Sequence, residues 1–189
     1  MTLFQTRGPA VEPVLLAEAK RHLRLEHDAE DGLVAGLIRA AREDVERQTG
    51  VAMVEQGWRL VLDRWPGGGA VALKRHPVRE IASVTLYGAD GLPVELDAGS
   101  WEADLHSRPA RLRADIPAIA LKGMNGIEID FLAGFGESGA DVPDGLKRAV
   151  LLLVAHWFEF RAGYGPDAQP VSYPPAFDRL LAPFRPGRL

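Results

Sequence analysis

Histidines and carboxylates are the residues of this sequence that could bind a metal ion. The histidines are His22, His27, His76, His106 and His156. No two of them stand at the i, i+4 spacing of an HExxH motif, which places two ligands on one face of a helix. Residues 26–31, EHDAED, offer oxygen ligands but lack the central Gly and terminal Glu of a calcium loop. We therefore predict no metal site and interpret this stretch as a solvated, negatively charged helix start.

The glycine-rich segment 134–139, GFGESG, is the one stretch that resembles a phosphate-binding or nucleophile loop. A P-loop ends in Gly-Lys-Ser/Thr, whose Lys reaches the phosphate and whose hydroxyl reaches Mg²⁺. This segment lacks that ending, and it does not match the Gly-x-Ser-x-Gly elbow of hydrolases. We interpret it as a crossover from a strand to a helix. The sequence therefore predicts no catalytic residue and no cofactor.

A short basic run beside Pro109 consists of Arg108, Arg111 and Arg113. It could contact a nucleic-acid backbone, pair with an acidic surface of a neighbouring subunit, or be a solvated loop. The chain has a net charge of -4 and a pI of about 5.7, whereas nucleic-acid-binding domains are usually basic. We therefore favour inter-subunit charge contacts over nucleic acid, and the solvated loop stays an alternative.

The composition is that of a soluble globular protein. With 189 residues, 47% hydrophobic and 25% charged, the chain can form one large domain or two small ones around a sizeable core. It has no cysteine, which excludes disulfides and thiolate metal sites and fits a reducing cytoplasm. The longest apolar run, residues 149–155, is far shorter than a bilayer-spanning helix, and the N-terminus lacks a signal-peptide layout. We therefore expect no membrane segment and no export signal.

Apolar residues at helical spacing predict three helices, at about residues 14–25, 31–48 and 144–161. The second should end at Gly50, since glycine is common just after the last helical residue. The third is the most apolar and should be central to the helical packing. Residues 1–13, punctuated by prolines, are expected to be a flexible arm.

After the second helix the apolar period changes from 3.6 to 2, which predicts a series of short strands. Turn residues at 66–69 and 90–91 separate some of them. The expected strands are 58–62, 71–74, 80–87, 93–96, 100–105, 118–122 and 126–132. Short strands separated by turns indicate a compact antiparallel sandwich or barrel.

The predicted fold is therefore α+β, with a three-helix body, an inserted small antiparallel β domain and a proline-rich C-terminal arm. The helical body comprises residues 1–50 and 140–163, and the β domain comprises residues 51–139. The arm comprises residues 164–189, with a short helix at about 175–181.

Aromatic residues, leucines and arginines are concentrated on the C-terminal arm, whose prolines prevent a long helix. Such apolar residues need a surface to bury against, which could be the protein's own core or a groove on a partner. Aromatic and Arg residues often dominate the binding energy of interfaces. The candidate docking residues are Tyr164, Tyr173, Phe177, Leu180, Leu181, Phe184, Arg185 and Arg188.

Several segments in a fixed order resemble the head–tail connector (adaptor) family of long-tailed phages, which includes the adaptors of gene transfer agents. Two of them are the helical segments 15–25, LLAEAKRHLRL, and 31–50, DGLVAGLIRAAREDVERQTG. In the sheet region they are 56–60, QGWRL, then Leu73 and Pro77-Val78 through Tyr87, then Asp90-Gly91. The last ones are 131–136, FLAGFG, and the segment from Val142-Pro143 to Trp157-Phe158-Glu159-x-Arg161. The resemblance covers roughly residues 14–161 and fits the C-terminal arm only loosely.

The resemblance implies a structural role without catalysis. Subunits of this family form a ring on the twelve-fold portal after DNA packaging and support the next tail-side protein, the stopper. DNA passes through the channel without sequence-specific binding, and the C-terminal arm often docks on the portal. The expected location is the host cytoplasm during assembly and then the head–tail junction. The alternatives are a small hydrolase or a monomeric binding module with a site between helices and sheet.

Overall fold

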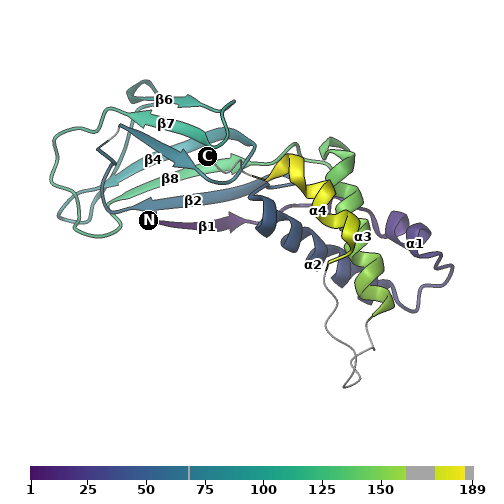
Figure 1. The fold of residues 1–189 in the computed structure, drawn as a ribbon. Helices are drawn as coiled ribbons and strands as arrows, with labels where there is room; N and C mark the ends of the chain where they lie inside the picture. The colour runs from purple at the N-terminus through teal and green to yellow at the C-terminus, as the bar shows by residue number, and fades with distance from the viewer. Residues whose placement is uncertain (68, 161–172, 186–189) are drawn as a thin grey trace, which may run out of the picture. The chain divides into compact units, whose positions relative to one another are not determined.

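The computed structural model describes residues 1–67, 69–160 and 173–185, and the chain divides into two compact units (Figure 1). We call residues 1–10 and 55–135 the β unit, and residues 11–54 and 136–189 the helical unit. Helices and antiparallel sheets occur together, which confirms the α+β class. Every helix in the described part of the chain is too short or too polar to span a membrane.

The β unit consists of two antiparallel sheets. In the larger sheet the strand order is β1 (Thr2–Arg7), β2 (Gln56–Leu62), β8 (Ile127–Ala133), β4 (Val78–Tyr87) and β5 (Pro93–Glu95). In the smaller sheet the order is β3 (Ala70–Leu73), β7 (Ala110–Ala114) and β6 (Trp101–Asp104). Figure 1 shows the smaller sheet lying over one face of the larger one.

Strand β8 is the centre of this unit because it pairs with both β2 and β4. Ile127, Ile129 and Phe131 are at most 1% exposed, whereas Glu128 and Asp130 lie on the opposite face. Burying a large apolar side chain contributes roughly 1.5–3 kcal/mol. The alternation predicted from the sequence therefore sets which face of β8 forms the core.

Two expectations for this unit were wrong. The first residues are not a flexible arm but strand β1, whose Leu3 and Phe4 pair with Leu60 and Arg59 of β2. The edge of β2 offers backbone partners that the N-terminal sequence does not reveal. Residues 118–122 are not a strand either, since only Leu121 forms an isolated bridge there.

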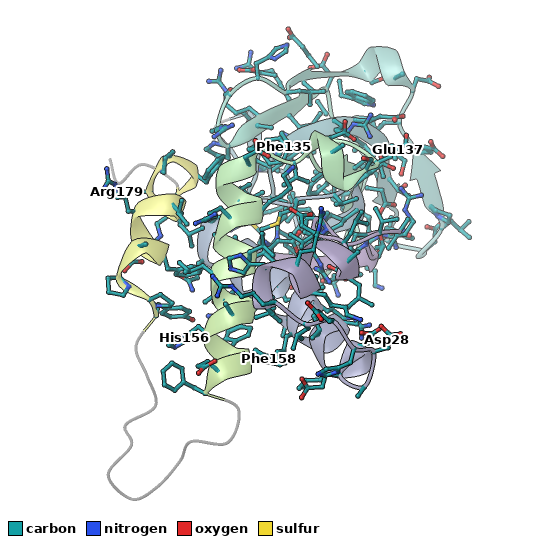
Figure 2. All side chains as sticks on the ribbon, turned by 90° about the vertical axis from the view of Figure 1, so that its right-hand side faces the viewer. Asp28, Phe135, Glu137, His156, Phe158 and Arg179 are labelled. Atoms are coloured by element: carbon teal, nitrogen blue, oxygen red, sulfur yellow. The ribbon has the colours of Figure 1, made fainter. Side chains whose placement is uncertain are left out.

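The helical unit contains α1 (Leu16–Leu23), α2 (Asp31–Thr49), α3 (Asp144–Glu159) and α4 (Pro175–Leu181). Helices α1, α2 and α3 are the three predicted ones, and α2 ends at Gly50 in the left-handed conformation. Helix α4 packs beside α3 (Figure 2), so the described part of this unit has four α-helices.

A buried ion network fastens the chain segments that flank α2. Arg42, only 5% exposed, donates to Glu12 at 2.8 Å and to Glu46 at 3.0 Å. Glu46 in turn accepts the backbone N–H of Met53 at 2.8 Å. Charged groups in such a position require partners, because their burial without one costs several kcal/mol. The network therefore ties the residues before and after α2 to the middle of that helix.

Candidate functional site

The predicted docking residues of the C-terminal segment divide into buried and accessible ones. Tyr164 and Arg188 lie outside the described residues. Phe177 and Leu181 are 0% exposed in the core of the helical unit. The accessible ones are Tyr173 and Arg185, which are exposed, and Leu180 and Phe184, which are half-buried. Of the described docking residues, these four are the ones that can touch a partner in this conformation.

The C-terminal segment is held by polar contacts to α2 as well as by its buried side chains. The ring of Tyr173 stacks on Phe177 with a centroid distance of 4.9 Å, and its hydroxyl donates to Asp44 at 3.2 Å. Arg185 donates to Gln48 at 3.1 Å. The opposite side of α4 is free, and Arg179 points away from α3 (Figure 2). The segment thus buries one face on its own chain and leaves another uncovered.

The basic run predicted from the sequence lies on strand β7 and in the turn before it. Arg111 donates to Asp104 across the β6–β7 pair, and this contact, followed by those from Ser107, holds the pKa of Asp104 well below its ordinary value. Arg113 lies opposite Glu102 in the register but has no ion pair among the described residues. Acidic residues of β6 therefore alternate with the arginines, which makes this face mixed rather than basic. Mixed charge suits a protein surface better than a phosphate backbone.

This face of the smaller sheet is hollowed beside the arginines. Ala70 and Ala72 of β3 lie opposite Arg113 and Arg111 in the register, so β3 contributes only methyl groups beside the two arginines. The hollow has a volume of about 200 Å³ and is lined by Ala70, Glu102, Asp104, Arg111 and Arg113. Its small size and its solvent-accessible charged side chains suit a single side chain of another protein rather than an enclosed substrate.

Ser138 and His156, two side chains that could take part in catalysis, make structural contacts instead. Ser138 and Asp141 form a capping box around the short turn 139–141, in which Ser138 accepts the N–H of Ala140 at 2.9 Å. His156 packs against Phe160 with a ring distance of 4.9 Å. Within the described ranges no three His, Asp or Glu side chains are grouped so that they could hold a metal ion.

A polar network on the outer face of the larger sheet was not anticipated from the sequence. Arg59 of β2 donates two hydrogen bonds to Asp130 of β8, both at 2.8 Å, and lies 2.7 Å from Glu128. Tyr87 of β4 donates to Glu128 at 3.0 Å, and this hydrogen bond raises the pKa of the Tyr87 hydroxyl. The alternation of Glu128 and Asp130 with apolar residues was the available signal, but the sequence does not reveal which strands are neighbours.

Comparison with known proteins identified one family and several solved structures. The model of the "Phage gp6-like head-tail connector protein" family matches residues 14–72. A chain in "Neck of empty GTA particle computed with C6 symmetry" is 29% identical, with a TM-score of 0.81. Chains in "Virion of native gene transfer agent (GTA) particle" and in "Neck of native GTA particle computed with C12 symmetry" are each 30% identical, with TM-scores of 0.81 and 0.79. Each match covers 100% of this chain and 97% of the other. No curated protein matched the sequence.

Proposed function

Because this chain belongs to the phage gp6-like head-tail connector family and is a structural connector of a phage-like particle, we propose that twelve copies form a ring between the portal and the tail. The observation that carries the proposal is the full-length similarity, at 30% identity, to chains of gene transfer agent particles. Two of the matched neck structures were computed with six-fold and twelve-fold symmetry, which supports a ring. A closed ring of identical subunits requires two different, complementary surfaces on each copy.

We propose that the parts of the chain have separate tasks in this ring. Helices α1 to α3 form a rigid body, and the β unit provides contacts to neighbouring subunits and to the tail-side stopper protein. DNA passes through the channel without sequence-specific contact. The ring assembles in the host cytoplasm and remains at the head–tail junction, acting without catalysis.

The C-terminal segment, residues 164–189, is our proposed portal-docking element. Its accessible side chains are of the types that favour interfaces, with an aromatic ring at Tyr173 and a guanidinium at Arg185. Deleting the whole segment would be a poor test, because Phe177 and Leu181 belong to the core of the helical unit. Substitutions at accessible positions change the docking surface and leave that core in place.

The test compares binding of two variants to the purified portal. The variant Leu180→Asp/Arg185→Glu should keep the wild-type melting temperature within a few degrees. It should bind the portal at least about tenfold more weakly, because changing central interface residues costs about 1.4 kcal/mol or more of binding free energy. The matched control Glu80→Lys changes an exposed residue of β4 and should bind normally. Equal binding by wild type and the double variant would refute the docking role of the segment.

A further inference from the structure

Residues 116–121, IPAIAL, form an exposed stretch that we call the apolar loop. All six residues are apolar, and none is buried. Ile119 is 39% exposed, and Met124 just beyond the loop is 72% exposed. Soluble proteins rarely leave so many consecutive apolar residues uncovered unless another molecule covers them. The apolar loop therefore has the character of an interface.

The ends of the apolar loop are fixed to the β unit. Before it, Asp115 donates its backbone N–H to Ser100 at 2.8 Å. At its end, the N–H of Lys122 donates to Tyr87 at 2.9 Å, and Ala120 accepts the N–H of Ala89 at 2.8 Å. These bonds hold the loop in a defined conformation, so presenting it to a partner costs less conformational entropy than ordering a free segment.

The helical unit carries a hollow of about 310 Å³ between the start of α1, the turn 139–141 and the first turn of α3. Its walls are mainly small or apolar, and Leu15 beside α1 is 69% exposed. The lining residues are Glu12, Pro13, Leu15, Glu18, Ser138, Gly139, Ala140 and Lys147. The charged side chains at the rim are Glu12, which is paired with the buried Arg42, Lys147, which is paired with the exposed Asp144, and Glu18.

The apolar loop and the hollow each carry an acidic and a basic side chain at their edges. The loop follows Asp115 and precedes Lys122, and both of these residues are exposed. At the hollow, Lys147 lies 2.9 Å from the exposed Asp144, and Asp144 first and then Glu18 raise the pKa of Lys147. One acidic and one basic group on each surface can pair across an interface and fix the direction in which the loop enters.

We propose that the apolar loop of one copy of this chain inserts into the hollow on the helical unit of the next copy, with Asp115 towards Lys147 and Lys122 towards Glu18. The inference rests on the proposed ring and identifies its subunit contact. The two surfaces are different and lie on different units, as the head-to-tail contacts of a cyclic ring require. A lipid surface fits less well, because membrane-binding segments combine apolar residues with several basic ones, and this loop has only Lys122 beside it.

The absence of cysteine in the chain allows a direct cross-linking test. Leu15→Cys/Ile119→Cys should give a ladder of covalent oligomers when purified particles are treated with a short bis-maleimide. Each single-cysteine variant should give no ladder. The control Leu33→Cys/Ile119→Cys uses a residue of α2 that is 41% exposed and lies outside the hollow, and it should also give none.

If Leu15→Cys/Ile119→Cys does not enter particles, Ala120→Cys/Ala140→Cys makes smaller changes at exposed positions and should give the same ladder. Variants that enter particles without forming a ladder would overturn the subunit contact and leave the connector role intact. Cross-linking of Ile119→Cys to the portal or stopper protein would also overturn it, as would flotation of the chain on phosphatidylserine vesicles that is lost in Ile119→Asp. Absence of the wild-type chain from purified particles would overturn the proposed function itself.

Discussion

Replacing Arg42 by Met tests whether the buried ion network stabilises the helical unit. The substitution keeps an unbranched side chain of similar length but removes the cation that contacts Glu12 and Glu46. The Glu12 side chain is 31% exposed, so water can replace its lost partner at little cost. The Glu46 side chain is only 7% exposed and cannot be hydrated in the same way. We therefore expect Arg42→Met to lower the free energy of unfolding by about 3–5 kcal/mol, mostly because Glu46 loses its buried cation.

Urea unfolding of the helical unit, followed by far-ultraviolet circular dichroism, measures this loss. The double variant Arg42→Met/Glu46→Gln removes the buried negative charge of Glu46 as well, and the amide oxygen of the glutamine can still accept the N–H of Met53. We expect it to recover about half or more of the stability lost in the single variant. Arg42→Met within about 0.5 kcal/mol of wild type, which is the range of ordinary surface substitutions, would show that the network does not stabilise the helical unit. A double variant no more stable than Arg42→Met would show that the charge of Glu46 is not the cause of the loss.

Two further predictions concern the packing of α4 and the smaller sheet. Phe177→Ala should lower the stability of the helical unit by about 3–5 kcal/mol, because Phe177 is fully buried, and the exposed Arg179→Ala should change it by less than about 0.5 kcal/mol in the same urea assay. Asp104→Asn should be less stable than wild type at pH 7. The lowered pKa of Asp104 gives stability that is present above the ordinary carboxyl pKa and is lost as the pH falls towards the folded-state value. The difference between Asp104→Asn and wild type should therefore shrink in acid, and a pH-independent difference would contradict this.

The parts of the fold that were predictable are those with a strong apolar period. Helix α3 and strand β8 show their buried faces in the sequence, because burial alone decides their pattern. Strand β1 was missed because it depends on a partner edge 50 or more residues away. The apolar content of residues 118–122 predicts a buried strand, whereas four of these residues are exposed and Leu121 is half-buried.

The candidate interfaces could likewise be predicted only in part from the sequence. Composition identified the aromatic and Arg residues of the C-terminal segment as interface residues, but not which of them face the protein's own core. Only the packing against α3 separates the buried Phe177 from the accessible Arg185. The pairing of Arg111 with Asp104 depends on the β6–β7 register, which the sequence does not specify.

The number of copies of this chain bound to one purified portal tests the connector ring most directly. Native mass spectrometry of the portal mixed with an excess of the full chain gives that number from the mass of the complex. If the chain forms a connector ring, we expect a complex with twelve copies of the 20.6 kDa chain for each twelve-fold portal. A portal that stays bare, or that binds a single copy at saturation, would contradict it.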